Sequence, residues 1–420
     1  MSLLESNGAA TIATIGTPSL TTEYQDFLFN YTGTGSYDIF LHRLSSASSA
    51  NQSIFIKSVS VIEIQQTDIP RLDYTNGTAS ILLEPQRFNG ITYSNNFDGT
   101  NMINSAIITE FNTTETLSPE GINNSSKLTA NSDFQRYSFY PTIGDNVDVS
   151  VSVFAKKGSA SVFKMLIIDK SGQAINDTFD LLNVTTLDGI GKIENYGNGW
   201  YRCSITASTS SGATAFQIRP FSHGAGYDNG WTGSNYIYGF GAQYEAGSYA
   251  TSYIPTSGSA VTRIADASSQ TVPNGVIGQT EGTLFAAIDF KYNNSTGDTR
   301  ICSIWDSGST EVVSIWARGN ALRYQYFDSN TSVNIENSIT ATQGVHKLAL
   351  SYNGNNLKVY MDGSVITNTN MSASANLNSN NLGFARFWGN QVIDHQIFIK
   401  QATVFNTALT SAELASLTTI

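Results

Sequence analysis

One glycine-rich loop of the sequence holds the residue types that bind sugars. Residues 224–233 carry two aromatic side chains, Tyr227 and Trp231, with Asp228 and Asn229 between them. Sugar rings present apolar C–H faces to flat aromatic rings, and their hydroxyl groups bond to carboxylates and amides. Loops commonly carry function, and this one offers little local core for a large side chain to join. We therefore predict a glycan-binding site here, the alternative being that Trp231 folds back over the end of a β-sandwich.

The other four tryptophans have different surroundings. Trp200 begins a predicted strand, and Trp305 and Trp316 alternate with apolar neighbours, so we expect these three to pack in the core. Trp388 also alternates with apolar neighbours and is mainly a core candidate, but its run RFWGN is retained as a second candidate loop for glycan contact.

The carboxylates do not form the pattern of a glycosidase. Such enzymes place two carboxylates roughly 5–9.5 Å apart beside the bond that breaks, and no Glu-x-Asp sequence occurs in the chain. Glu194 and Glu245 are single carboxylates on or beside predicted strands, and we expect both to face solvent. The four histidines are scattered, and phosphate-binding loops are absent. We therefore expect no enzymatic activity, with a polysaccharide depolymerase as one alternative.

Metal and cofactor sites are also not indicated. Asp298, Asp306 and Asp328 lie near predicted hairpin loops, but calcium needs about six to eight oxygen ligands, and turn formation is the simpler role for these residues. Cys203 and Cys302 form neither a CxxC motif nor a Cys/His pattern. We predict no metal, no cofactor and no disulfide framework.

The negative charge of the chain disfavours two classes of partner, nucleic acids and anionic membranes. The formal net charge is −11, and only 13% of the residues are charged. A nucleic-acid binder normally carries a basic stripe, and an anionic membrane attracts polybasic segments; the sequence has neither. No apolar run is long enough to span a bilayer, and the first residues lack the features of a signal peptide. We expect no nucleic acid, no membrane insertion and no signal-dependent export.

The elements that must position these residues are mainly β-strands. Apolar and polar residues alternate with a period of two in 147–154, 348–352 and 357–361, which predicts strands with one buried and one solvated face. Pairs that tolerate positive φ punctuate the strands and predict hairpin turns; they include Asn89-Gly90, Asn353-Gly354 and Asp362-Gly363.

Only residues 410–417 indicate a helix, which opens with a capping-box pattern. Short strands with frequent turns and almost no helix indicate an all-β protein made of two antiparallel β-sandwich domains, preceded by a partial β segment. The predicted division is an N-terminal arm (1–22), a partial sandwich or anchoring segment (23–68), a connector (69–91), a first sandwich (92–254), a linker (255–281) and a second sandwich (282–420). The partial segment has strand candidates at 26–31, 37–41 and 53–64, and we expect another subunit or another protein to complete its sheet.

The first sandwich resembles the carbohydrate-binding-module-like jelly rolls of tailed-phage virion proteins. The most specific runs are residues 192–205 (KIENYGNGWYRCSI) and 238–256 (YGFGAQYEAGSYATSYIPT). Residues 144–158, 257–263, 70–74 (PRLDY) and 82–87 (LLEPQR) follow the same pattern. Such jelly rolls occur in tail fibres, tail-tip proteins and head fibres.

The second sandwich resembles laminin-G-like, concanavalin-A-like domains. The similar runs are 345–354 (VHKLALSYNG), 357–363 (LKVYMDG) and 402–414 (ATVFNTALTSAEL). In this resemblance His346 opens a strand and has a structural role. Together the two resemblances cover roughly residues 70–420, whereas the first 68 residues match only the end of such a module.

The resemblance implies a non-enzymatic virion protein, a head or tail fibre or another surface appendage. It would be assembled in the host bacterial cytoplasm, lie at the virion surface as a homo-oligomer, by resemblance a trimer, and bind host-surface glycans. Its N-terminal region would contact other virion proteins. The main alternative is a purely structural decoration or tail-assembly protein that binds only other virion subunits.

Overall fold

The structure is a computed structural model of the 420-residue chain. It describes residues 2–5, 11–14, 37–40, 71–73, 79–95, 97, 102–105, 108–130, 135–140, 145–209, 213–221, 235–291, 297–306, 311–328, 333–387, 390–391, 393 and 396–420. The chain forms two compact units, 1–64 and 65–420. In the described ranges strands dominate and one α-helix occurs, so the prediction of an all-β protein is confirmed.

The N-terminal unit contains a small antiparallel sheet in the order β2-β1-β3 (Ser2–Glu5 is β1, Thr11–Thr14 is β2 and Tyr37–Phe40 is β3). The expectation of an unpatterned arm over 1–22 is therefore wrong for residues 2–5 and 11–14. The strand edge of β3 bonds to β1 of the same chain, because backbone N–H and C=O groups need partners wherever water is removed. The strand candidates at 26–31 and 53–64 lie outside the described residues.

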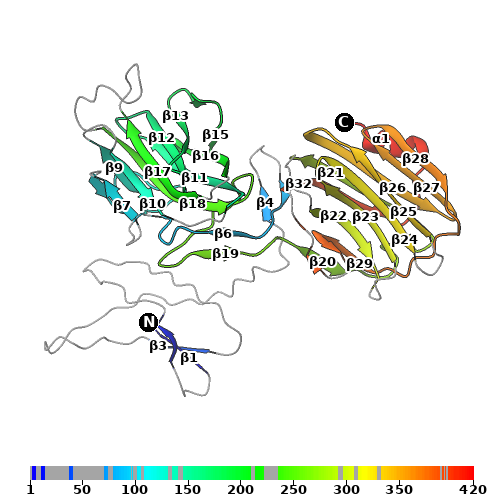
Figure 1. The fold of residues 1–420 in the computed structure, drawn as a ribbon. Coiled ribbons are helices and arrows are strands. Elements are labelled where there is room, and N and C mark those ends of the chain that lie inside the picture. The colour runs from blue at the N-terminus through cyan, green and yellow to red at the C-terminus, as the bar shows by residue number, and fades with distance from the viewer. Residues whose placement is uncertain are drawn as a thin grey trace. The chain divides into compact units, whose positions relative to one another are not determined.

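The first sandwich consists of two antiparallel sheets, with six described strands in each (Figure 1). One has the order β14-β13-β12-β17-β10-β7 and the other β15-β16-β11-β18-β9-β8. In chain order the strands are β7 Met102–Ser105, β8 Ile108–Glu110, β9 Ser126–Ala130, β10 Arg136–Phe139, β11 Val147–Lys157, β12 Val162–Asp169, β13 Ala174–Asp180, β14 Thr185–Thr186, β15 Lys192–Asn195, β16 Trp200–Thr209, β17 Ala213–Phe221 and β18 Asn235–Ala246.

Strand β11 shows how this sandwich is built. Val149, Val151 and Val153 belong to the core between the two sheets. On the opposite face Ser152 and Phe154 are buried as well, so the predicted solvated face of this strand is wrong. Phe154 belongs to a second apolar cluster with Trp200, Tyr238 and Phe240 on the outer side of the sheet.

The segment 111–125 contacts part of this outer face through polar contacts. The indole Nε1 of Trp200 donates to the carbonyl oxygen of Leu117 at 2.8 Å. The hydroxyl of Tyr238 donates to a carboxylate oxygen of Glu115 at 2.6 Å, and Lys127 forms an ion pair with the other oxygen of Glu115. The alternation of residues in β11 did not predict that another segment covers the outer face of the sheet, because residues 111–125 have no strand pattern of their own.

The second sandwich pairs a sheet in the order β28-β27-β26-β21-β32-β5-β4 with a sheet in the order β20-β29-β22-β23-β24-β25. Leu350, Val359 and Tyr324 are among the residues of the core between them. The strands are β4 Arg71–Asp73, β5 Ser80–Leu83, β20 Ser268–Thr271, β21 Glu281–Phe290, β22 Asp298–Trp305, β23 Glu311–Arg318, β24 Ala321–Asp328, β25 Val333–Thr340, β26 Gly344–Asn353, β27 Asn356–Met361, β28 Ser364–Asn370, β29 Asn381–Phe384 and β32 Ile397–Phe405.

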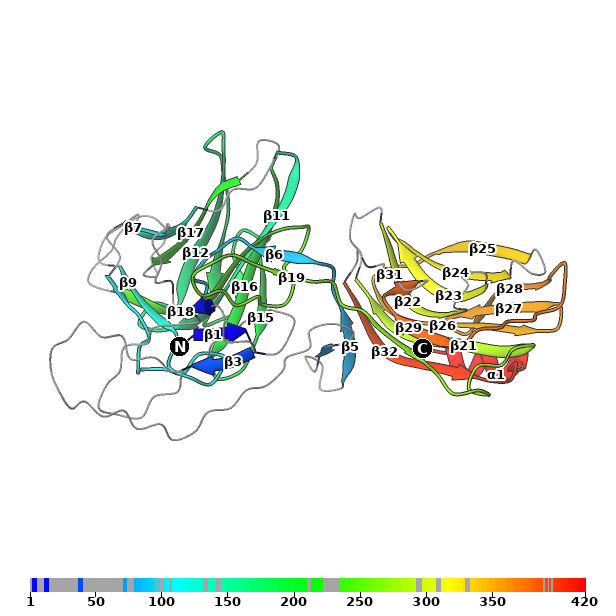
Figure 2. The ribbon, with the colours of Figure 1, turned by 90° about the horizontal axis from the view of Figure 1, so that it is seen from below.

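The sheets of the second sandwich extend beyond residues 282–420. Strand β5 pairs with β32, next to which it lies in Figure 2, and β20, from the predicted linker, pairs with β29. The predicted connector and linker thus contribute strands, because an edge strand of a sheet offers unpaired backbone groups to any segment within reach. Farther along the chain β6 (Arg87–Asn89) pairs with β19 (Val261–Arg263).

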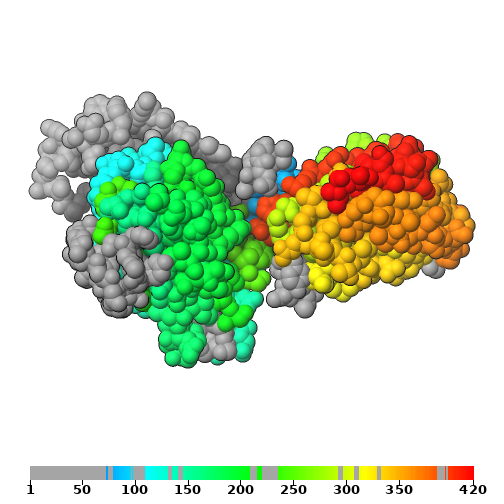
Figure 3. Space-filling model, turned by 90° about the horizontal axis from the view of Figure 1, so that it is seen from above, coloured from blue at the N-terminus to red at the C-terminus, as the bar shows by residue number. Residues whose placement is uncertain are grey.

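Helix α1 (Ser411–Thr418) confirms the helix predicted at the C-terminal end. Its capping box joins Thr410 and Glu413. Leu414 is fully buried and packs with Phe285 and Tyr360 on the outer face of the sheet that contains β26 and β27. Figure 3 shows α1, in red, lying on the strands coloured orange.

The glycine-containing pairs have two different outcomes. Asp362 and Gly363 both adopt positive φ, 51° and 78°, between β27 and β28, so the predicted hairpin turn is confirmed. Asn89-Gly90 instead lies at the end of β6, which pairs with β19 from a distant part of the chain. The buried amide of Asn89 donates to the carbonyl oxygens of Ala242 and Ile254 at 3.3 and 2.8 Å. It therefore satisfies two backbone acceptors that are distant in the sequence.

A buried carboxylate joins segments that are distant in the sequence. Glu84 is fully buried. Its carboxylate forms an ion pair with Arg263 at 3.0 Å and accepts bonds from the backbone N–H of Ser252 at 3.1 Å and the side-chain amide of Gln396 at 2.7 Å. The backbone N–H of Glu84 donates to Asp266. Four stretches of chain thus meet at one side chain.

Replacing Glu84 by leucine will destabilise the protein by about 3 kcal/mol, because a largely buried guanidinium loses its carboxylate partner. The N–H of Ser252 and the amide of Gln396 lose their acceptor as well. Urea unfolding followed by fluorescence measures the change. Glu110→Leu, at an exposed position, is the control and should change stability little. An equal midpoint for the two variants would contradict the importance given to Glu84.

Candidate functional site

The residues that the sequence singled out for glycan binding lie outside the described residues. They are Tyr227, Asp228, Asn229, Trp231 and Trp388. Their prediction stands untested, and the site below is built from other residues.

Trp305 and Trp316 are buried, as expected, but they do not belong to the core between the sheets. Ile315 and Ala317 point into that core, so Trp316 lies on the outer face of its sheet. Three guanidinium groups lie near its ring, those of Arg300, Arg318 and Arg323, at 4.3, 5.1 and 5.0 Å from the ring centroid. Both parities of this strand are apolar, so alternation could not separate core from outer face.

Ion pairs and burial hold the arginine cluster around Trp316 in place. Asp298 binds Arg318 at 2.6 Å, and Glu336 binds Arg323 at 3.4 Å. Burial lowers the pKa of Arg300 to about 10. The indole is only 2% exposed, so the cation–π contacts and the burial of the ring leave no face for a sugar to stack on.

The two carboxylates singled out in the sequence have different outcomes, because Glu194 keeps a partly exposed side chain and Glu245 does not. Glu194 is half-buried and pairs with Lys192 at 2.6 Å. Glu245 is almost fully buried, so its predicted solvent exposure is wrong. It accepts bonds from the side-chain amide of Gln243 at 2.7 Å and from the backbone N–H of Thr251 at 2.8 Å. Burial raises the pKa of Glu245, and the hydrogen bonds of its carboxylate hold the segment after β18 in place.

The remaining chemically interesting side chains are held in structural contacts. His346 bonds through Nδ1 to Asp362 at 2.7 Å and through Nε2 to the carbonyl oxygen of Thr342 at 2.8 Å. Cys203 and Cys302 are free thiols in the two cores, and burial raises the pKa of both, that of Cys302 to about 12. Among the described residues no cluster of His, Cys, Asp or Glu is arranged to hold a metal ion, and no helix is long and apolar enough to cross a membrane.

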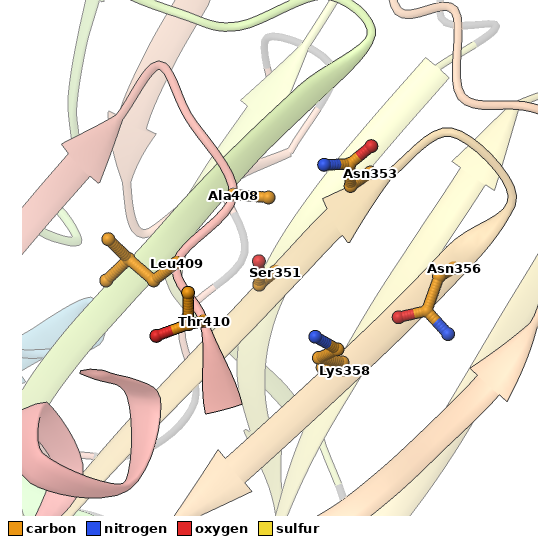
Figure 4. Close-up of a pocket in the computed structure, with 7 residues that line it drawn as sticks. All are labelled: Ser351, Asn353, Asn356, Lys358, Ala408, Leu409 and Thr410. Carbon is orange, nitrogen blue, oxygen red and sulfur yellow. The ribbon is translucent and has the colours of Figure 1, made fainter. Parts of the chain in front are cut away.

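A surface pocket of about 160 Å³ lies beside the start of α1 on the second sandwich (Figure 4). One wall is the outer face of β26 and β27, and the other is the segment that leads into the helix. Its lining residues are Ser351, Asn353, Asn356, Lys358, Ala408, Leu409 and Thr410.

The pocket arises from the local pattern of the hairpin. Leu350 and Leu357 point into the core, so Ser351 and Lys358 point outward. The N–H of Leu409 donates to Thr283 at 3.1 Å, which fixes the segment opposite. The sequence contained part of this signal, since 351, 353, 356 and 358 are polar positions of one hairpin face. It did not indicate which segment closes the second wall.

The polar groups of the pocket are only partly used within the protein. Asn353 donates through Nδ2 to Glu281 at 3.2 Å, and Asn356 donates through Nδ2 to Asn368 at 3.1 Å. Both amides therefore keep their carbonyl oxygen as an acceptor. No described residue lies within hydrogen-bond or ion-pair distance of the ammonium group of Lys358, which is half-buried.

Comparisons with known proteins identify no family. No family model and no curated protein match the sequence. Solved structures with similar regions include the botulinum neurotoxin serotype G binding domain, with 16% identity and a TM-score of 0.30 over 36% of this chain and 39% of that chain. The CBM40 of the Ruminococcus gnavus IT-sialidase, bound to α2,3-sialyllactose, has 13% identity and a TM-score of 0.30 over 34% and 84%.

The ligand-binding domain of botulinum neurotoxin serotype D, in complex with N-acetylneuraminic acid, has 14% identity and a TM-score of 0.30 over 36% of this chain and 39% of that chain. This chain thus spans well under half of the two neurotoxin domains. Similarities of this size support no conclusion about the ligand or activity of this chain.

The capping box at the edge of the pocket predicts a pH dependence of stability. Thr410 donates through its side chain and its backbone to Glu413, and these two bonds lower the pKa of Glu413 from 4.5. A lowered pKa means that the carboxylate stabilises the fold above pH 4.5 and that this contribution is lost as the pH falls through the folded-state pKa.

Glu413→Gln keeps the capping-box geometry but does not titrate. The wild type should therefore exceed the variant in stability at pH 7 and lose that advantage below pH 4.5. Urea midpoints at pH 7, 5, 4 and 3 measure it; a difference that stays constant over this range would refute the assignment.

Proposed function

We propose that this protein is a non-enzymatic surface appendage of a tailed-phage virion and that its second sandwich binds host-surface glycans in the pocket beside α1. The observation that supports the binding site is the combination of a concave, uncharged amide and hydroxyl lining with one lysine that has no partner among the described residues. The family resemblance of residues 70–420 supports the virion assignment.

The pocket chemistry suits one sugar ring with an acidic group. Its volume of about 160 Å³ is below the roughly 300–1,000 Å³ of most small-molecule sites, so it accommodates one ring rather than an extended chain. The amide oxygens of Asn353 and Asn356 accept bonds from sugar hydroxyls, and the methyl group of Ala408 offers a small apolar surface to the C–H face. Lys358 can form a charge-assisted bond to a carboxylate.

The assembly part of the proposal extends the resemblance. We propose a homo-oligomer, a trimer in the fibres that it resembles, anchored to other virion proteins through the N-terminal region and exposed at the virion surface. The loop at 224–233 and the loop of Trp388 remain separate proposed glycan contacts.

Lys358→Gln is expected to weaken glycan binding at least tenfold, because a charge-assisted hydrogen bond is worth about 1.5–3 kcal/mol. A glycan array identifies the best acidic ligand for the full chain, and calorimetry compares the variants. Lys157→Gln, an exposed position on the first sandwich, is the matched control and should bind like the wild type.

Equal affinity of Lys358→Gln and wild type would place binding elsewhere. If the full chain binds no glycan and only other virion proteins, the structural-decoration alternative is correct. Release of reducing ends from host polysaccharide would instead support the depolymerase.

A further inference from the structure

The two walls of the pocket beside α1 differ in the polar groups that they leave for a ligand. Residues 408–410 form one wall, and the hairpin of β26 and β27 supplies Asn353, Asn356 and Lys358 to the other. In Figure 4 Asn353 lies toward the upper end of the pocket and Lys358 toward the lower end. The hydrogen-bond partners of these groups within the protein decide what each can still donate or accept.

The backbone N–H groups of the wall that precedes α1 are bonded within the protein. The N–H of Ala408 donates to a carboxylate oxygen of Glu281 at 3.3 Å, and the N–H of Leu409 donates to the hydroxyl oxygen of Thr283 at 3.1 Å. The next residue donates its N–H and its hydroxyl to the capping-box carboxylate. This wall therefore has no donor left for a ligand.

Two carboxylates lie behind the same wall. Glu281 accepts the bond from Ala408, and Glu413 accepts the bonds from Thr410 at 2.8 and 2.7 Å. Carboxylates carry a negative charge at neutral pH, so an anionic group of a ligand is repelled from this side of the pocket. The opposite wall holds the single lysine.

The two amides of the hairpin wall are oriented as acceptors toward the ligand. An ionised carboxylate can only accept, so Asn353 directs its NH₂ group to Glu281 at 3.2 Å and keeps its carbonyl oxygen for other partners. The NH₂ group of Asn356 donates to the backbone carbonyl oxygen of Thr369 at 3.2 Å, which fixes that amide in the same sense. One oxygen of Glu281 thus bonds to Asn353 in one wall and to Ala408 in the other.

Lys358 is the main donor that the pocket offers. No described residue lies within hydrogen-bond or ion-pair distance of its ammonium group, which belongs to a half-buried side chain. The other hydroxyl of the hairpin wall, that of Ser351, is buried and lies 3.1 Å from the hydroxyl of Thr283. The pocket therefore combines one cation with two amide acceptors and two carboxylates behind the far wall.

We infer that the pocket selects a hexuronic acid, a sugar with one carboxylate and with hydroxyls as its other substituents. The carboxylate accepts a charge-assisted bond from Lys358, and the hydroxyls donate to the carbonyl oxygens of Asn353 and Asn356. Glu281 determines this specificity because it fixes the amide of Asn353 as an acceptor and places a negative charge behind the far wall. The inference rests on the proposed glycan binding and names the class of sugar.

Three other classes of sugar fit less well. A neutral sugar leaves the ammonium group of Lys358 without an anionic partner. An acetamido group, as in sialic acids, brings a carbonyl oxygen that would be buried without a donor, which costs free energy. A phosphate or sulfate added to a uronic acid brings a second negative charge toward Glu281 and Glu413, where it is repelled.

Ligand-observed NMR titrations of the full chain at pH 7 test the selection. The probes are D-glucuronic acid, D-glucose, N-acetylneuraminic acid and D-glucuronic acid 1-phosphate. Glucuronic acid should bind about tenfold more tightly than each of the other three, the effect of one well-placed bond in a buried site. In Lys358→Gln the preference for glucuronic acid over glucose should be lost.

The outcomes separate this inference from the proposed function. Binding of N-acetylneuraminic acid or of the 1-phosphate as tight as that of glucuronic acid, and lost in Lys358→Gln, would overturn the selection and leave the glycan pocket in place. If no acidic sugar binds in a manner that depends on Lys358, both the pocket and the selection are wrong.

Glu281→Gln distinguishes a specificity role from a structural one. Glutamine keeps an acceptor for Asn353 and Ala408 but removes the charge. The variant should therefore bind glucuronic acid about as well as the wild type and bind the 1-phosphate several-fold more tightly. An equal loss of affinity for both sugars would contradict the role given to Glu281. Glu110→Gln removes the same charge at an exposed position of the first sandwich and should bind all four sugars like the wild type.

Discussion

The buried carboxylate of Glu84 is the constraint on which the larger unit depends. A charge removed from water must be paired and hydrogen-bonded, and here its partners come from residues 252, 263 and 396. The chain therefore returns to the side chain of Glu84 after it has formed most of each sandwich. Glu245 and Asn89 are buried polar side chains of the same kind. Each is hydrogen-bonded to a backbone group of the segment that follows β18. Polar side chains, and not only apolar packing, define how the strands before and after the first sandwich are held.

The outer faces of the sheets then determine where a ligand can bind. On the first sandwich, an aromatic layer with Phe154 and Trp200 is closed by the segment 111–125. On the second, arginines cover Trp316 on one sheet and α1 covers part of the other. The rings of Trp200 and Trp316 are thereby covered by other parts of the chain. Among the described residues the pocket beside the start of α1 stays open, and its lining is mainly amide and hydroxyl.

Much of the fold could be predicted, because it is written in local patterns. The period-two runs form strands β11, β26 and β27, Asp362-Gly363 forms its turn and Thr410 begins the helix. The errors occurred where a distant segment decided the environment. Glu245 was expected at the surface but is buried, and its carboxylate lies 3.8 Å from the guanidinium of Arg87. Asn89 bonds to carbonyl groups more than 150 positions away. The polar positions of the hairpin that contains Lys358 indicated one wall of the candidate pocket. Its second wall comes from residues 408–410, which the sequence pattern did not indicate.

The sequence by itself determined the fold class, the strands, the turn at Asp362-Gly363 and the capped helix, because period, φ preference and capping act over a few residues. The tertiary structure alone decided which face of each strand is covered and which strands join which sheet. It also decided which polar groups are spent on the chain itself and which remain for a partner. The physical reason is that burial and hydrogen-bond satisfaction belong to pairs of segments. Lys358, with no partner in the described part of the chain, and Glu84, with several, are equally ordinary charged residues until the rest of the chain is in place.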